Sequence, residues 1–177
     1  MATNHAHDRG DIAFLPLQVA IVTVSDSRDL GSDRSGALLQ EKLQQAGHQC
    51  CQRIIVKDEV ELIQQQVREL LHRPEVHSII VTGGTGVTPR DVTPEAVEPL
   101  YQKPLPGFGE LFRALSFQEI GAACIQSRAS AGLANGKVIW VLPGSTGACR
   151  LAIDSIILPQ LDSRTRPCSF PGLLMVE

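Results

Sequence analysis

The sequence lacks any apolar run near the roughly 20 residues that a membrane-spanning helix requires, and its polar beginning, MATNHAHDRGD, has no apolar centre like that of a signal peptide. It also lacks an excess of basic residues, because the formal net charge is −3 and the two signs are interspersed. These absences argue against a membrane protein and against a basic face for nucleic acid. We therefore expect a cytoplasmic protein that binds neither membrane nor nucleic acid.

Metal-binding and disulfide motifs are missing as well. The five cysteines form no C-x-x-C pair and no zinc-binding spacing, so we expect buried thiols in a reducing compartment: Cys50, Cys51, Cys124, Cys149 and Cys168. The adjacent Cys50 and Cys51 would point to opposite faces of a strand, so they cannot hold one metal together. His5 and His7 lie in a polar N-terminal tail. The other histidines lie near the ends of predicted elements, where we expect solvated side chains: His48, His72 and His77.

The length of 177 residues suits one domain, which can bury a full hydrophobic core without disulfides. We expect residues 17–168 to form this domain, with a flexible N-terminal tail over residues 1–16 and a C-terminal tail over residues 169–177. In the first half, apolar runs rich in β-branched residues alternate with stretches of helical periodicity. The runs predict strands at 17–24, 50–56 and 76–81, and the periodic stretches predict helices at 34–46, 59–71 and 93–101.

This alternation predicts an α/β fold, a three-layer α/β/α sandwich with a mostly parallel central sheet. The ligand sites of such sheets lie at the carboxyl ends of the strands. Asp58 is expected to cap the second helix. Thr93 is expected to cap the third helix, because Pro94 follows it. The second half is less regular: we expect a helix at 109–121, a strand at 137–142 and a helix at 146–157, whereas residues 122–134 fit either a helix or a strand.

The run VTGGTGVTPRD, residues 81–91, joins a predicted strand to a glycine turn that ends in a carboxylate. Gly83, Gly84 and Gly86 have no Cβ atom, so backbone N–H groups of this turn can approach a phosphate closely. Asp91 would repel a bare phosphate, but a divalent cation between the two groups would reverse that effect. The pattern therefore indicates a site for a magnesium nucleotide.

The glycine turn does not match the common nucleotide and hydrolase motifs. It lacks the Gly-Lys-Ser/Thr ending of a P-loop and the third glycine of the dinucleotide fingerprint. Ser145 lies in PGSTG, which is not the G-x-S-x-G turn of a hydrolase nucleophile. Taken alone, the turn also fits a tight structural loop after a buried strand.

A combination of motifs in a fixed order is more specific. TGGTG is followed by RDVTPEA, and then by PGFGELFR, SRASAG and LPGSTGACR. In this combination the sequence resembles the MoaB/MogA family of molybdenum cofactor biosynthesis proteins over roughly residues 17–168. PGSTGACR and the later PQLDSRTRPC resemble the B-type members most closely. The PGSTG turn departs from the PGxP-like turn of the adenylating members, which leaves the fit of pterin or nucleotide open.

The resemblance implies adenylylation of molybdopterin, in which the terminal phosphate of molybdopterin attacks the α-phosphate of magnesium ATP and pyrophosphate leaves. A phosphate monoester with a second pKa of ~6 is already an anionic nucleophile at neutral pH, so no serine, cysteine or histidine base is required. Asp58 and Asp91 match the family's essential aspartates, and the resemblance implies that both are catalytic and bind Mg²⁺. By themselves, the two residues also fit structural roles, as a helix cap and a turn residue.

The resemblance also implies a wider binding site for molybdopterin and nucleotide. The positions that match the family's pocket are Ser25, Asp26, Thr82, Gly83, Gly84, Thr85, Gly86, Ser127, Arg128, Gly144 and Ser145. Thr85 would add a hydroxyl to the N–H groups of the glycine turn. Arg128 would hold a phosphate through paired hydrogen bonds, or else lie on the surface as a solvated arginine.

Two other functions stay open beside an adenylyltransferase. One is a non-catalytic protein that binds molybdopterin or nucleotide, and the other is a scaffold that contacts a molybdenum-insertion protein. Because family members are trimers or hexamers, the resemblance implies a homotrimer or hexamer, with the apolar helix around Leu111, Phe112 and Leu115 as a candidate interface. The two aspartates favour catalysis, since a protein that only binds would have no metal for them to hold.

Overall fold

The computed structural model describes residues 13–174 and has a central sheet with the strand order β2-β1-β3-β6-β5-β4. Four neighbouring strands are parallel, as predicted: β2 (Gln49–Val56), β1 (Gln18–Val24), β3 (Ser78–Thr82) and β6 (Lys137–Leu142). Two further strands extend the sheet through antiparallel pairs: β5 (Ser130–Ala134) and β4 (Lys103–Pro104). The predicted α/β fold with a mostly parallel sheet is confirmed.

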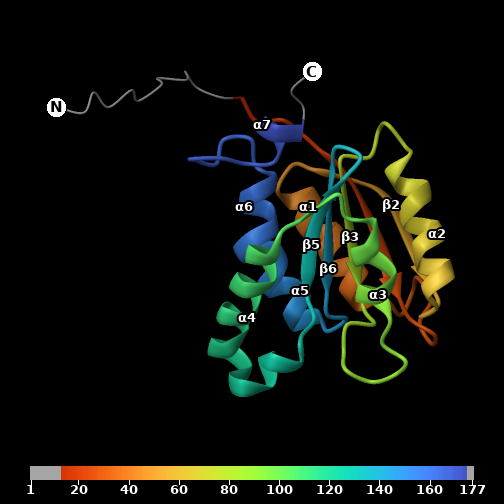
Figure 1. Cartoon of the computed structure of the whole chain (residues 1–177). Helices are drawn as coiled ribbons and strands as arrows, with labels where there is room; N and C mark the ends of the chain where they lie inside the picture. The colour runs from red at the N-terminus through yellow and green to blue at the C-terminus, as the bar shows by residue number, and fades with distance from the viewer. Residues whose placement is uncertain (1–12, 175–177) are drawn as a thin grey trace.

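Helices cover both faces of the sheet, which gives the three predicted layers (Figure 1). One face is covered by α1 (Arg34–Gln45), α4 (Pro106–Ile120), α5 (Thr146–Ala152) and α6 (Leu158–Leu161). The other face is covered by α2 (Val60–Leu71) and α3 (Thr93–Val97), and a 3₁₀ turn at Glu98–Leu100 follows α3. A short α7 (Pro171–Leu174) follows α6 in the chain.

The two faces of the sheet have separate hydrophobic cores. In β1, Val19 and Ile21 pack in the core beneath α1 and α5, whereas Ala20 and Val22 pack in the core beneath α2. Because both sets are fully buried, the strand is a continuous apolar run and not an alternating one. Trp140 of β6 anchors the first core, with its ring packed against two aromatic rings, those of Phe108 and Phe170.

Several element boundaries differ from the prediction. Residues 122–134, which fitted helix or strand, divide into a 3₁₀ segment at Gly121–Gln126 and strand β5. A two-residue turn joins β5 to β6, and both of its residues have positive φ, Asn135 at 48° and Gly136 at 70°. The helix α4 begins three residues earlier than expected, at Pro106, and the last helix continues through a π-helical turn at Ile153–Ile157 to Leu161.

The two predicted helix caps are wrong. The residue that precedes α2 is Glu59, whose side chain makes no capping hydrogen bond. The carboxylate of Asp58 turns instead toward the glycine turn, where it accepts the N–H of Val92 at 3.3 Å. Thr93 is the first residue of α3 and not its cap, and its buried hydroxyl has no hydrogen-bond partner among the described residues.

The cysteines and histidines are only partly placed as expected. All five thiols are free, but only Cys124 and Cys149 are buried, and Cys168 is exposed. The expectation of a solvated His48 is wrong, because this side chain is 3% exposed and its Nδ1 accepts the N–H of Leu17. His5 and His7 lie outside the described residues.

The ends of the described chain pack against the domain. The ring of Phe14 lies 5.1 Å from that of His48, and the Arg164 guanidinium lies 5.0 Å above the Phe14 ring. The N–H of Leu15 donates to the hydroxyl of Ser163 at 3.0 Å. Residues 14 and 15 are thus held by contacts with residues from much later in the chain, while the limits 17–168 stay a prediction.

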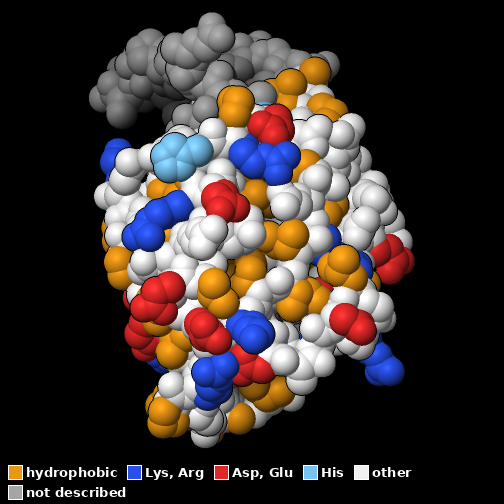
Figure 2. Space-filling model, turned by 90° about the vertical axis from the view of Figure 1, so that its right-hand side faces the viewer, with side chains coloured by type: hydrophobic (Ala, Val, Ile, Leu, Met, Phe, Trp, Pro, Cys, Tyr) orange, Lys and Arg blue, Asp and Glu red, His pale blue; other side chains and the backbone are white. Residues whose placement is uncertain are grey.

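The surface formed around α2 and α3 carries acidic and basic side chains interspersed with apolar ones (Figure 2). This distribution agrees with the small net charge of the sequence. Within residues 13–174, no helix is both long enough and apolar enough to cross a bilayer. The expected absence of nucleic-acid binding stays a prediction.

Two neutral histidines hold the beginning of β1. The Nδ1 atom of His48 accepts the N–H of Leu17 at 3.2 Å, and the Nδ1 atom of His77 accepts the N–H of Gln18 at 2.9 Å. Burial lowers the pKa of both histidines. A protonated Nδ1 cannot accept these bonds, so the unfolded chain binds protons more readily than the folded one. Stability is therefore retained at neutral pH and lost as the pH falls below the ordinary histidine pKa of about 6.5.

We predict that the midpoint of thermal unfolding falls when the pH is lowered from about 7.5 to about 5.5. His48→Asn should reduce this fall, because the Asn oxygen can accept the Leu17 N–H without titrating. His72→Asn is the matched control, since His72 is exposed. Calorimetry over a pH series measures the effect. An equal fall in the wild type and in His48→Asn would contradict the assignment.

Candidate functional site

The carboxyl ends of β1, β3 and β6 meet at one edge of the sheet, and the loops that follow them surround a cavity of about 680 Å³. Most of the predicted site residues line this cavity: Ser25, Thr82, Gly83, Gly84, Thr85, Gly86, Asp91, Ser127, Gly144 and Ser145. Asp26, Asp58 and Arg128 do not line it. The cavity has the size of typical small-molecule sites, which span about 300–1,000 Å³.

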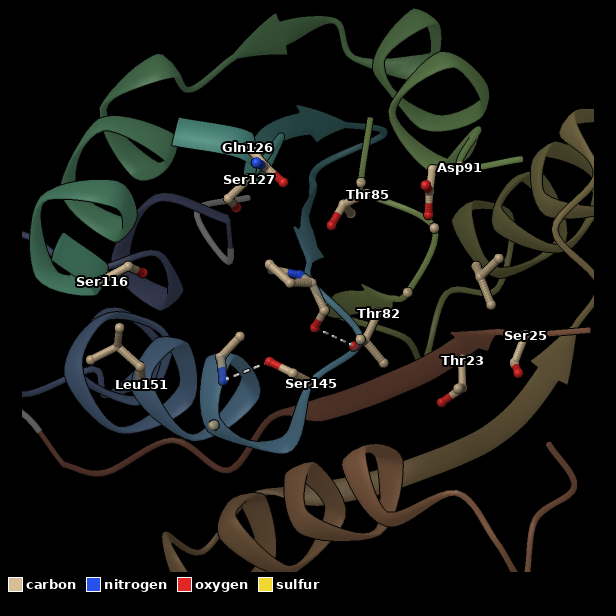
Figure 3. Close-up of a pocket in the computed structure, with 18 of the residues that line it drawn as sticks. Thr23, Ser25, Thr82, Thr85, Asp91, Ser116, Gln126, Ser127, Ser145 and Leu151 are labelled. Atoms are coloured by element: carbon tan, nitrogen blue, oxygen red, sulfur yellow. Dashed lines mark hydrogen bonds between the residues drawn. The ribbon is translucent and has the colours of Figure 1, made fainter. Parts of the chain in front are cut away.

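Hydroxyl-bearing side chains from different loops surround the cavity, among them those of Thr85, Ser127 and Ser145 (Figure 3). The Thr82 hydroxyl donates to the carbonyl of Pro143 at 3.0 Å, which ties the ends of β3 and β6 together. Ser145 caps α5, because its Oγ accepts the N–H of Ala148 at 3.2 Å. In this bond Ser145 is the acceptor, so its own O–H is available to a ligand.

The glycine turn of residues 83–91, called here the glycine loop, depends on two residues with positive φ. Gly83 has a φ of 106°, and a Cβ atom there would lie 2.2 Å from the carbonyl oxygen of Val24. Gly84 has a φ of 60°, and a Cβ atom there would lie 2.7 Å from Oδ2 of Asp58. The glycines thus allow the loop to pass directly over β1 and over a carboxylate.

Asp91 lies at the end of the glycine loop and faces the cavity (Figure 3). Its Oδ2 accepts both the hydroxyl of Thr88 at 2.5 Å and the N–H of Thr88 at 3.1 Å. The Thr88 hydroxyl holds the pKa of Asp91 below the ordinary aspartate value. The cavity therefore contains an ionised carboxylate at neutral pH.

Asp58 lies beneath the glycine loop and is 9% exposed. Burial raises its pKa, and the nearby negative charges of Asp91 and Asp26 raise it further. The two predicted catalytic aspartates are thus close enough to interact. Asp58, however, is separated from the cavity by the backbone of the loop.

The carboxylate of Asp26 is engaged by the protein. Both of its oxygens accept hydrogen bonds from the guanidinium of Arg90, each at 2.7 Å. Oδ1 also accepts the N–H of Asp58 at 3.2 Å. Asp26 therefore joins the loop after β1 to the glycine loop, and it does not face the cavity.

Arg128 supports the glycine loop from outside the cavity. Its Nε donates to the carbonyl of Gly86 at 2.8 Å, and its Nη2 donates to the carbonyl of Asp91 at 2.7 Å. The remaining nitrogen, Nη1, pairs with Glu95. The guanidinium that was predicted to hold a phosphate is thus occupied by groups of the protein itself.

A magnesium ion fits this set of donors. Among residues 13–174, no group of three or more His, Cys, Asp or Glu side chains could hold a metal by itself. Mg²⁺ usually takes only one or two carboxylates and completes its coordination with water and substrate phosphates. Asp91 supplies such a carboxylate on the cavity side, and the buried charge of Asp58 lies behind the same loop.

Several cavity residues were not predicted. They come from the loop after β1, from α4 and the segment after it, and from α5: Ser27, Arg28, Phe112, Ser116, Glu119, Ile120, Gln126 and Leu151. The α4 residues had no sequence signal, because an amphipathic helix does not reveal which part of its surface faces a ligand. Arg28 lies in the polar cluster SDSRDLGSDRSG that follows β1, and its position at a strand end was the available signal.

Comparison with known proteins gives consistent results. Residues 20–163 match a family model described as a probable molybdopterin binding domain. The chain is 48% identical to molybdenum cofactor biosynthesis protein B of Escherichia coli K12 over 157 residues, which is 89% of this chain and 92% of the relative. It is 42% identical to the protein of the same name from Bacillus subtilis over 158 residues, 89% of this chain and 91% of the relative.

Solved structures agree with these matches. A crystal structure of a molybdenum cofactor biosynthesis protein B superposes with a TM-score of 0.83 at 47% identity, covering 85% of this chain and 94% of that one. The tungsten cofactor synthesizing protein MoaB of Pyrococcus furiosus superposes with a TM-score of 0.72 at 33% identity, covering 80% and 91%. Sequence, fold and cavity therefore agree that the chain belongs to the MoaB/MogA family of molybdopterin-binding proteins.

Proposed function

We propose that this protein acts in molybdenum cofactor biosynthesis as a molybdopterin adenylyltransferase that uses magnesium ATP. The broader role is supported by the molybdopterin-binding family to which the chain belongs and by the names of its relatives. In the proposed reaction, a phosphate oxygen of molybdopterin forms a bond to the α-phosphorus of ATP. The bond from that phosphorus to the bridging oxygen breaks, and pyrophosphate leaves with the electron pair.

The observation that supports this reaction best is the ionised Asp91 beside a glycine loop in one cavity. Two anionic substrates must be brought together, so the protein has to position phosphates and reduce their repulsion. It does not need a nucleophile of its own, because the molybdopterin phosphate is already anionic at neutral pH. In agreement, Cys149, whose Sγ lies 3.2 Å from the Thr82 hydroxyl, is a buried thiol whose pKa is raised to about 11 by burial.

The residues of the chain have distinct tasks in this proposal. The glycine loop supplies backbone N–H groups, and the hydroxyls of Thr85, Ser127 and Ser145 donate hydrogen bonds to phosphate or pterin oxygens. Asp91 would hold Mg²⁺, with the charge of Asp58 behind the loop adding to the attraction. When bound there, Mg²⁺ neutralises negative charge on the phosphates. Arg90 and Arg128 keep the loop in place through Asp26 and through backbone carbonyls.

A non-catalytic molybdopterin-binding protein is the second candidate. The PGSTG turn, which departs from the PGxP-like turn of adenylating members, favours this alternative, because Gly144 and Ser145 of the turn line the cavity. A scaffold that contacts a molybdenum-insertion protein would use the outer surface instead. The product of the reaction distinguishes catalysis from both alternatives.

We predict that purified protein mixed with molybdopterin, ATP and Mg²⁺ releases pyrophosphate and forms adenylyl-molybdopterin. Mass spectrometry identifies the product, and a coupled assay follows pyrophosphate. Chelation of Mg²⁺ with EDTA should stop both signals. Binding of molybdopterin without either product would support the non-catalytic alternative and contradict the enzyme proposal.

Asp91→Asn should lower turnover by about 100-fold or more, because it removes the proposed Mg²⁺ ligand, and Asp58→Asn should lower turnover by a smaller factor, because it removes the charge behind the loop that attracts the cation. Both Asn variants keep an oxygen that can accept the present backbone N–H, from Thr88 and Val92 respectively. Asp58→Asn should not lower the unfolding temperature, since the raised pKa of Asp58 means that its charge opposes folding.

Asp154→Asn is the matched control for these variants, because Asp154 forms only a surface ion pair with Lys42. Turnover and its dependence on Mg²⁺ concentration are measured for all three variants. Wild-type values for both Asp58→Asn and Asp91→Asn would refute the metal role.

We further predict a homotrimer or homohexamer. The helix α4 offers only part of the interface expected from the sequence, because Phe112 is 1% exposed and Leu115 packs at the edge of the core. Leu111 and Phe117 are exposed, at 48% and 60%, and are available to a second copy. Size-exclusion chromatography with light scattering at micromolar concentration measures the mass. A monomer alone would contradict this prediction.

A further inference from the structure

Arg28 differs from the other arginines around the site. Among the described residues that line the cavity it is the one cation, and the lining also contains two carboxylates, those of Asp91 and Glu119. Arg90 and Arg128 are engaged by Asp26 and by the glycine loop. Arg113 donates to the backbone carbonyls of Ser127 and Ala129. The Arg28 guanidinium has no such partner among the described residues.

The position of Arg28 identifies the part of the cavity that it serves. Its backbone N–H donates to Oγ of Ser25 at 3.2 Å, which places it in the turn directly after β1. Figure 3 shows Ser25 on the same side of the cavity as Asp91, opposite Ser116 and Leu151. Arg28 is exposed and lines the cavity, so its guanidinium can reach a ligand that is bound there.

The two sides of the cavity differ in chemistry. On the Asp91 side the lining consists mainly of the glycine loop and small polar residues. The opposite side includes the apolar side chains of Phe112, Ile120 and Leu151, together with Ser116 and Glu119 of α4. A flat pterin suits the second side, and a phosphate chain with its cation suits the first. A free guanidinium on the first side can form paired hydrogen bonds to phosphate oxygens.

We propose that Arg28 binds the β- and γ-phosphates of the nucleotide, the group that leaves as pyrophosphate. This inference rests on the proposed function, because it assigns a subsite within the same cavity. Arg28 stabilises the negative charge that develops on the leaving group when the bond to the α-phosphorus breaks. It also makes the site select a nucleoside triphosphate over a monophosphate, since AMP lacks both phosphates that Arg28 contacts.

The test is calorimetric titration of the full chain with three probes in the presence of Mg²⁺: ATP, AMP and inorganic pyrophosphate. Arg28→Gln should weaken the binding of ATP and of pyrophosphate by about 10-fold to 100-fold, the usual effect of losing hydrogen bonds between charged groups. AMP binding should change by less than about 2-fold, since no contact with AMP is lost. Arg28→Lys should give intermediate values, because it keeps the charge and loses the paired geometry.

Arg34→Gln is the matched control. Arg34 is exposed at the beginning of α1, six positions after Arg28, and does not line the cavity, so the same change of charge should leave all three affinities unaltered. Circular dichroism and thermal unfolding confirm that all three variants are folded.

Three results would overturn the inference. If Arg28→Gln binds ATP and pyrophosphate with wild-type affinity, Arg28 does not contact the nucleotide. If the affinities for ATP and AMP fall equally, Arg28 contacts the α-phosphate instead. A wild-type protein that binds none of the probes would reject the nucleotide site as a whole, and with it the proposed adenylyl transfer. The first two results leave the proposed reaction standing, so the two failures are distinguishable.

Discussion

The passage of the glycine loop over the Asp58 carboxylate is the contact on which the rest of the site depends. Only glycine can occupy position 84, because a Cβ atom there would lie within 3 Å of Asp58 and of the Thr93 hydroxyl. The close approach lets Asp58 accept the N–H of Val92, which leads into α3. Asp91 precedes Val92 and is thereby held at the cavity, so a buried carboxylate sets the position of a half-buried one.

Most of the charged side chains around this contact are paired with other groups of the protein. Arg90 neutralises Asp26, and Arg128 binds the carbonyls of the loop together with Glu95. These arginines make the loop rigid without adding positive charge to the cavity. The cavity itself is left with Asp91, Glu119 and Arg28, a set that attracts a cation and a phosphate chain together more readily than a bare anion.

The sequence predicted most of the fold because its signals were local. The apolar runs of β1, β3 and β6 and the periodicity of α2 determine their elements directly. Strand ends indicated that Ser25 and Asp91 would lie at one edge of the sheet, whereas Ser145 was implied by the family resemblance. The directions of side chains could not be predicted from local signals. Contacts between residues more than 30 positions apart determine whether Arg128 faces a phosphate or a carbonyl. Such contacts also determine whether Asp58 caps a helix or lies under a loop.

The raised pKa of Asp58 helps to distinguish a catalytic protein from one that only binds its ligand. A buried carboxylate whose pKa is raised by burial and by two neighbouring aspartates destabilises the folded chain at neutral pH. Asparagine would accept the same N–H of Val92 without that cost. A negative charge in this place is therefore not explained by folding, and it fits the proposed attraction for a cation at the adjacent Asp91. Binding of a pterin alone would need neither carboxylate, so the two aspartates favour the proposed magnesium-dependent transfer over the non-catalytic alternative.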